Sequence, residues 1–184
     1  MLKIHIKFIK KNKIIKKKIK SKIKKKFKLW KKIDSIEFKD TNQCLSILKK
    51  KKIISSPWID DIFKKNNYSY KNFPKPINLY RVKLKDFNFT SPTTLQKFYK
   101  KISPQFKLVH PAIALYCRLI YNEQKTGEWL RFATPMTAMI DSDGVPHLPK
   151  LGKALKIFFI ETYWSYPKAI FHPHNEFVVI KNDI

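Results

Sequence analysis

Apolar residues follow two different periods near the start of the chain. In residues 2–9 they alternate with lysine and histidine, which is typical of a strand or of an extended strip lying on a partner. From about Asn12 to Ile33 they recur every three or four positions, with lysines between them. This second spacing predicts an amphipathic helix of about five or six turns.

A pair of short helices is predicted next. Asp40 or Thr41 is placed to cap a helix that runs through Leu48. The dipeptide Ser56-Pro57 then predicts a second helix, because serine is a good N-cap and proline suits the first helical position. The pair resembles a helix-turn-helix only loosely. Residues 66–76, rich in asparagine, aromatic residues and proline, predict a loop or linker.

The rest of the chain mixes strand and helix patterns. Ser91-Pro92 and His110-Pro111 predict the starts of two helices. The first should end at Ser103-Pro104, and the second should be buried, although its residues also fit a strand. Strands are expected at 77–85, 128–133, 137–141 and 176–181, whereas 151–164 fits either a helix or a buried strand. The strand at 77–85 should be half-buried, with one apolar face (Tyr80, Val82, Leu84) and one basic face (Arg81, Lys83, Lys85).

Charge changes the picture most. The chain has 40 lysine and arginine residues against 13 aspartate and glutamate residues, a net charge of +27. Residues 1–32 hold sixteen lysines and no acid, residues 33–110 hold sixteen bases and six acids, and residues 111–184 hold eight bases and seven acids. A charge present only for solubility would not fall away along the chain in this manner. The gradient therefore predicts contact with a polyanion through the N-terminal half.

Together these patterns predict an α+β fold in which a small mixed body follows a long basic N-terminal arm. We expect three parts: residues 1–33 as a lysine-rich RNA-binding arm, 34–76 as the helical pair and linker, and 77–184 as the α+β body. The predicted phosphate contacts are the basic residues of the arm, the first short helix and the basic strand. They are Lys16, Lys17, Lys18, Lys20, Lys22, Lys24, Lys25, Lys26, Lys28, Lys31, Lys32, Lys49, Lys50, Lys51, Lys52, Arg81, Lys83 and Lys85.

Three aromatic residues in the polar loop, Tyr68, Tyr70 and Phe73, are candidates for stacking on unpaired bases or for a protein contact. The stretch Trp164–Pro167 in the nearly neutral body predicts a protein-facing patch. The arm also fits other roles, namely a nuclear address, a helix on an anionic membrane surface or a mitochondrial transit peptide.

Patterns of catalytic chemistry are weak. Asp141, Asp143 and His147 form an acid and histidine cluster, but the sequence DSDG is also an ordinary turn with self-capping aspartates, which we favour. His172 and His174 lack a third metal ligand nearby, and the two cysteines have no zinc-site spacing. With three glycines in the chain, a phosphate-binding loop is difficult to build. We expect no catalytic residue, no metal, no cofactor and no small-molecule substrate.

No run of 18 apolar residues is free of charge, so we expect no transmembrane segment. The composition is skewed toward residues with AT-rich codons, such as lysine, isoleucine and asparagine. With its lysine-rich extension, the chain resembles organellar ribosomal proteins from AT-rich genomes. The segment INLYRVKLKDF (77–87) and the following helix are similar to the first strand and helix of the small-subunit ribosomal protein S-ten family, whose proline-rich basic loop has no counterpart after Ile102.

These observations lead us to expect a structural constituent of the mitochondrial ribosome that is not an enzyme. It would bind rRNA through its N-terminal half and neighbouring ribosomal proteins through its C-terminal half. The composition and the presence of Met1 suit a matrix protein encoded in the organelle itself. Three alternatives stay open: a matrix-side accessory subunit of a respiratory-chain assembly, a nuclear or chromatin DNA-binding protein, and an enzyme acting on RNA.

Overall fold

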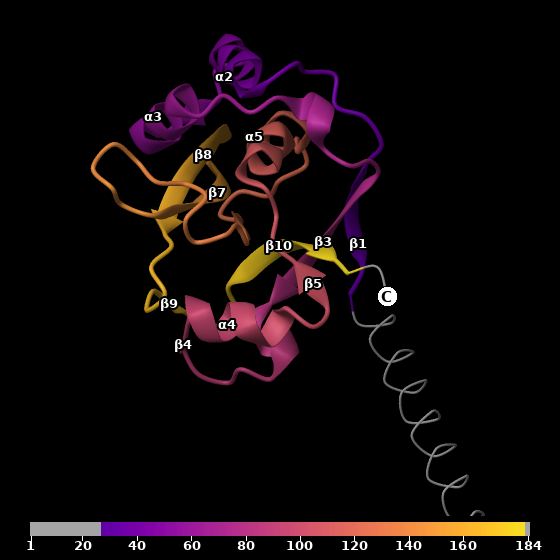
Figure 1. Cartoon of the computed structure of the whole chain (residues 1–184), viewed down its shortest axis with the longest axis vertical. Helices are drawn as coiled ribbons and strands as arrows, with labels where there is room; N and C mark the ends of the chain where they lie inside the picture. Colours follow the sequence, from indigo (N-terminus) through magenta and orange to yellow (C-terminus); the bar gives the residue numbers. More distant parts are fainter. Residues whose placement is uncertain (1–26, 183–184) are drawn as a thin grey trace, which may run out of the picture.

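A mixed β-sheet with helices on both faces organises the chain (Figure 1). The computed structural model describes residues 27–182, and the expected α+β fold is confirmed. The helices are α2 (Thr41–Lys50), α3 (Pro57–Lys65), α4 (Leu95–Ile102) and α5 (Pro111–Ile120), with 3₁₀ turns at Tyr70–Asn72 and Leu84–Phe87. The strands are β1 (Leu29–Ile33), β2 (Ile54–Ser55), β3 (Ile77–Lys83), β4 (Thr93–Thr94), β5 (Phe106–Lys107), β6 (Trp129–Phe132), β7 (His147–Ala154), β8 (Ile157–Trp164), β9 (Ile170–Phe171) and β10 (Glu176–Lys181).

The order of strands in the main sheet is β1-β3-β10-β6-β7-β8-β2, and β5 pairs with β10 beside this path. The pairs β10–β6 and β2–β8 are parallel, and the other pairs are antiparallel. Strands β4 and β9 form a separate two-stranded ribbon. The last described strand, β10, therefore lies between β3 and β6 in the interior of the sheet.

Two hydrophobic clusters lie on opposite faces of this sheet. On β10, Val178 belongs to the cluster shared with α2, α3 and α5, whereas Phe177 and Val179 belong to the cluster shared with α4. This alternation follows from the period of two in a strand. Figure 1 shows the same arrangement, with α2, α3 and α5 on one side of the sheet and α4 on the other.

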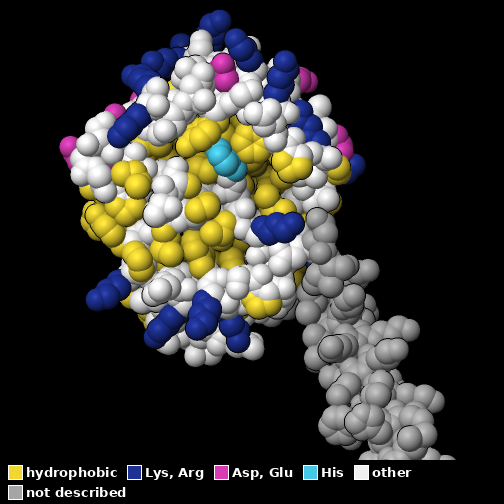
Figure 2. All heavy atoms as spheres, in the orientation of Figure 1, with side chains coloured by type: hydrophobic (Ala, Val, Ile, Leu, Met, Phe, Trp, Pro, Cys, Tyr) yellow, Lys and Arg dark blue, Asp and Glu magenta, His cyan; other side chains and the backbone are white. Residues whose placement is uncertain are grey.

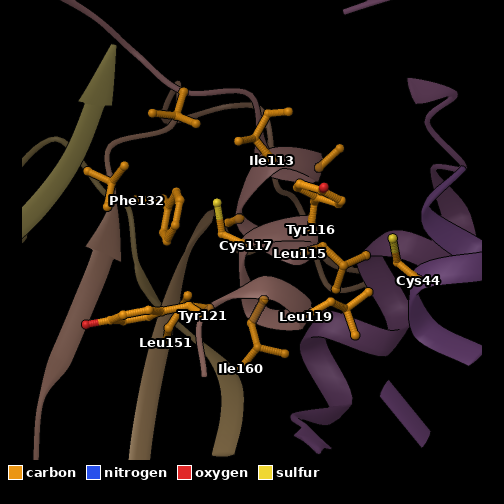
Figure 3. Close-up of a cluster of buried hydrophobic side chains, with 14 of the residues drawn as sticks. Cys44, Ile113, Leu115, Tyr116, Cys117, Leu119, Tyr121, Phe132, Leu151 and Ile160 are labelled. Atoms are coloured by element: carbon orange, nitrogen blue, oxygen red, sulfur yellow. The ribbon is translucent and has the colours of Figure 1, made fainter. Parts of the chain in front are cut away.

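Helix α5 is buried on all sides, with only Ile120 partly exposed. Figure 3 shows Phe132 and Leu151 of the sheet on one side of α5 and Cys44 of α2 on the other. The hydroxyl of Tyr70 donates to the carbonyl of Ala112 in the first turn at 2.8 Å. The helical pair and the loop after it therefore share one core with the body.

Arg118 of α5 is fully buried. Its guanidinium donates to the side-chain oxygen of Gln124 and to the carbonyl of Tyr121, and it lies 4.6 Å from the ring centroid of Phe158. Burial lowers the pKa of Arg118 to about 10. The buried cation thus ties the segment after α5 back to the helix.

Local capping patterns identify the helix starts well. Asp40 accepts from the backbone N–H of Gln43, and Ser56 accepts from that of Ile59, as the sequence predicted. His110 caps α5 before its proline. Helix α4 is the exception, because Thr94 caps it and the residues after Ser91-Pro92 first form β4.

Some predictions from periodicity were wrong. Residues 2–26, on which the strand-like start and most of the arm helix were predicted, lie outside the described residues. The end of the predicted helix is strand β1, where a one-residue bulge shifts the register with β3 between Leu29 and Lys31. The bulge lets Trp30 and Ile33 pack on the same core. Apolar residues three positions apart, which predicted a helix, therefore lie in a bulged strand here.

Two further differences concern the body. Residues 137–141 form a turn and a single bridge instead of a strand, and the ambiguous segment 151–164 belongs to the β7–β8 hairpin. Strand β3 has no solvent-facing basic side. Leu79 packs on one cluster and Val82 on the other, because a hydrophobic cluster covers each face of the sheet.

Among the described residues, no helix is long and apolar enough to span a lipid bilayer.

The hairpin provides a test of the core. A Cβ added at Gly152 would overlap the ring of Phe159 on the neighbouring strand. We expect Gly152→Ala to destabilise the protein by about 1–3 kcal/mol, the usual range for overpacking. Urea denaturation measures this, and Phe159→Leu in the same chain should recover part of the loss. Equal stability of Gly152→Ala and the original protein would contradict the packing described here.

Candidate nucleic-acid interface

Lysines gather at the C-terminal ends of α2 and α3. Lys49 and Lys50 end α2, Lys51 and Lys52 follow it, and Lys64 and Lys65 end α3; all six are exposed. The partial negative charge of a helix C-terminus favours cations there. Lys49 and Lys64 also border a hollow of about 250 Å³ between the two helices, together with Asp60. Figure 2 shows this concentration of basic side chains at the end of the molecule where α2 and α3 lie.

A second basic group lies on α4, and the sequence analysis missed it. Lys97, Lys100 and Lys101 are exposed on the helix face opposite the buried residues Phe98 and Ile102. The helical spacing of these lysines could have identified the group, but it is a weaker signal than the long lysine runs elsewhere in the chain. Figure 2 shows basic side chains over α4, with a broad hydrophobic area between them and the lysines over α2 and α3.

A hollow of about 460 Å³ lies where the loop after the 3₁₀ turn Tyr70–Asn72 meets β5, the start of α5 and the end of β10. Phe73 and His110 contribute aromatic rings to its wall, and Lys107 and Lys181 contribute basic side chains. The rings of Phe73 and His110 are 4.8 Å apart and meet edge to face at 76°. A hollow with aromatic walls and lysines can hold an unpaired base beside its phosphate.

His110 has a defined protonation state. Its Nδ1 accepts from the backbone N–H of Ala112 at 3.2 Å, and burial lowers the pKa of the ring below its ordinary value of 6.5. The ring is therefore neutral at pH 7 and carries its proton on Nε2. The wall of the hollow thus includes a neutral N–H donor.

The other predicted phosphate contacts are in several environments. Lys16, Lys17, Lys18, Lys20, Lys22, Lys24, Lys25 and Lys26 lie outside the described residues. Lys28 and Lys85 are exposed and Lys83 is half-buried. Lys31 pairs with Glu123 at 2.8 Å, and Lys32 pairs with Asp34 at 2.6 Å.

Arg81 was predicted on a basic outer face, and the structure corrects this. Its guanidinium is half-buried and paired with two carboxylates, those of Glu128 and, at 2.6 Å, Glu176. Burial opposes the charged form, but the hydrogen bonds to these carboxylates raise the pKa of Arg81 above its ordinary value. Because both partners neutralise it locally, Arg81 is a poor phosphate ligand.

The three predicted stacking residues also differ. Tyr70 is buried in the core, so its ring cannot stack on a base, and burial strongly raises the pKa of its hydroxyl. Tyr68 is half-buried and packs edge-on against His110 with ring centroids 4.6 Å apart. Phe73 alone of the three lines the hollow described above.

Within the acid and histidine cluster, Asp141 and His147 form a buried, hydrogen-bonded pair. Oδ1 of Asp141 accepts from the backbone N–H groups of Asp143 and Val145, and Nε2 of His147 lies 2.9 Å from its Oδ2. The hydrogen bond from His147 lowers the pKa of the Asp141 carboxyl. Burial of this pair was not predicted from the sequence. Asp143 is exposed and does not join it.

Between residues 27 and 182, no three histidine, cysteine or acidic side chains come close enough to hold a metal ion. The rings of His172 and His174 lie against each other with centroids 5.6 Å apart. Both cysteines are free and buried. Burial raises the pKa of Cys44 to about 11, and it raises that of Cys117 further, so neither is a reactive thiolate at neutral pH.

Comparison with known proteins adds no family: no protein-family model, no curated protein and no solved structure matches the chain.

His110 generates a prediction about pH. Since its pKa is lower in the folded than in the unfolded protein, the unfolded chain takes up the proton first as the pH falls. The stability associated with neutral His110 is therefore complete above about pH 6.5, the ordinary value, and is lost below it. His110→Asn keeps a capping acceptor but cannot titrate. We expect the original protein to lose more stability than His110→Asn between pH 7 and pH 5, measured by urea denaturation. Parallel pH profiles would contradict this assignment.

Proposed function

We propose that the protein is a structural, non-catalytic constituent of the mitochondrial ribosome. In this proposal the lysine-rich N-terminal arm and the basic surfaces of the body bind rRNA, and the less charged C-terminal half contacts neighbouring ribosomal proteins. The observation that carries it is the pairing of two exposed lysine groups, on α2–α3 and on α4, with the hollow that contains Phe73 and His110.

Chemistry favours RNA over duplex DNA as the anion. Recognition of unpaired bases uses aromatic rings beside cations, and such bases are common in folded RNA. The pair α2–α3 does not form the tight turn of a helix-turn-helix, because β2 lies between the helices and pairs with β8. This makes insertion of α3 into a major groove less favourable than contact with an irregular phosphate surface.

The lysines of α4 provide a direct test. Neutralising Lys97, Lys100 and Lys101 to glutamine in the full chain should weaken binding to a purified rRNA fragment, because three phosphate contacts are lost. If all three contact phosphates, the slope of log K against log salt should become shallower by about 2. The control replaces Lys125, Lys156 and Lys168, which are also exposed, and should change the slope less. Equal effects of both triple variants would refute a specific role for α4.

Substitutions in the arm can distinguish RNA from lipid as its anionic partner. A helix lying on a membrane has to insert its apolar stripe, so serine at Ile15, Ile19 and Ile23 should abolish vesicle binding. Phosphate contacts along rRNA depend on lysine instead. We therefore expect these serine substitutions to weaken rRNA binding less than neutralising Lys16–Lys18 and Lys24–Lys26 together.

Co-sedimentation of each full-length variant with rRNA and with anionic vesicles measures both effects. Vesicle binding that depends on the isoleucines, without rRNA binding at physiological salt, would favour the accessory subunit of a respiratory assembly.

A further inference from the structure

A hollow of about 230 Å³ lies between the start of α3 and the end of the β7–β8 hairpin. It is lined by Trp58, His147, Thr162, Tyr163 and Trp164. Trp58 and Trp164 come from different elements, and they are 51% and 62% exposed. Two exposed tryptophans beside one hollow form an apolar surface of the kind that anchors partner side chains.

The backbone beside this hollow has an open edge. Strand β2 pairs with β8 at Phe159 and Ile160 only, after which the chain turns away into α3. The backbone N–H of Ser56 donates to the carbonyl of Ile160 at 3.0 Å, so the polar groups of Ile160 point away from β7. Because this direction alternates along a strand, those of Thr162 and Trp164 point the same way.

Two contacts agree with this assignment. Thr162 lies opposite Pro149, which has no N–H to offer, and the N–H of Ser165 donates to Pro146 at 3.0 Å. Among the described strands, β7 and β2 are the ones that pair with β8. The outer edge at Thr162 and Trp164 is therefore open to an added strand.

His147 supplies a recessed polar atom. The residue is 2% exposed, and its ring stacks with that of Trp58, with ring centroids 6.0 Å apart and 30° between the planes. Nε2 bonds to the Asp141 carboxylate, whereas Nδ1 has no hydrogen-bond partner among the described residues. The hollow thus has a ring nitrogen without a partner at its base and apolar rings at its rim.

Acidic side chains lie on two of the elements beside the hollow. Asp61 is on α3, and Asp141 and Asp143 are in the loop before β7, whereas Arg131 and Lys150 lie against the ring of Tyr163 on the sheet side. The backbone N–H and hydroxyl of Ser142 donate to Asp61 at 2.9 and 2.8 Å, which holds the loop against α3. Residues 53–63 and 132–149 contain no lysine or arginine. RNA phosphates are disfavoured here, and a basic segment is favoured.

We propose that this groove binds an extended segment of a neighbouring protein in which apolar residues alternate with lysine or arginine. The main chain of that segment adds to the open edge of β8, one apolar side chain enters between Trp58 and Trp164, and a basic side chain faces Asp61 and Asp143. Main-chain pairing supplies affinity and the pocket supplies specificity, as in other strand-addition sites. This deepens the protein-contact part of the proposed function and is independent of rRNA binding.

The test uses the full chain and a blocked seven-residue peptide, acetyl-Lys-Val-Lys-Phe-Lys-Val-Lys-amide, with a glutamate-for-lysine analogue as the matched control. A net charge of +27 attracts the glutamate peptide at long range, so a preference for the lysine peptide has to come from a local site. By NMR in about 150 mM salt, we expect the lysine peptide to shift the indole signals of Trp58 and Trp164 and to bind at least about tenfold more tightly. Equal or tighter binding of the glutamate peptide overturns the proposal. It is also overturned if an eight-nucleotide uridine oligomer shifts the two indole signals and the lysine peptide does not.

Two sets of variants test the parts of the groove. Thr162→Pro removes the outward N–H without removing a bond to β7, and should weaken peptide binding at least about tenfold, whereas Thr162→Val keeps the N–H and should bind normally. Asp61→Asn with Asp143→Asn tests the charge without touching the strand and should weaken binding at least about threefold. Its control, Asp34→Asn with Glu37→Gln, changes exposed acids elsewhere and should have no effect. The proposal is overturned if Thr162→Pro binds the lysine peptide as well as the original protein does. If Thr162→Pro does not fold, undiminished peptide binding by the Asp61→Asn and Asp143→Asn double variant overturns it instead. Loss of rRNA binding in any variant bears only on the proposed function.

Discussion

Helix α5 has no solvent-facing side, so the rest of the chain has to enclose it. The sheet covers one side of it, and α2 with the loop around Tyr70 covers the other. Each buried methylene group contributes about 0.8 kcal/mol, so separating α2 from α5 would be costly. The lysines at the ends of α2 and α3 are consequently fixed relative to the body. A rigid arrangement of charges recognises a particular shape of phosphate backbone better than a flexible tail does.

Arginine and lysine have separate places in this protein. The three arginines, Arg81, Arg118 and Arg131, are buried or half-buried, and Arg118 and Arg131 lie against aromatic rings. A guanidinium ion is weakly hydrated and planar, so it tolerates burial beside rings and carbonyl groups better than an ammonium ion does. Lysine supplies most of the exposed charge. In this lysine-rich chain, the three arginines thus occupy buried or half-buried positions that suit a planar guanidinium group.

Local chemistry made some elements predictable and long-range pairing made others unpredictable. Asp40, Ser56 and His110 cap helices from within their own sequence neighbourhood, so the starts of α2, α3 and α5 could be predicted. The partners of Arg81 are 47 and 95 residues away, and nothing near it indicated that carboxylates would neutralise it. The β7–β8 turn is formed by Leu155 and Lys156, both with positive φ, where glycine or asparagine would have been expected. The hollow beside Phe73 and His110 likewise joins three separate segments, residues 72–78, 107–113 and 180–181, which no local pattern could have revealed.

The position of β10 has a consequence for biosynthesis. This strand is the last described element to leave the ribosome, yet it separates β3 from β6 in the finished sheet. Until it emerges, β3 and β6 each present an open edge, and the two hydrophobic clusters lack Phe177, Val178 and Val179. A nascent chain in that state exposes surfaces that favour aggregation, so its synthesis would benefit from a chaperone or from rapid capture by its partners.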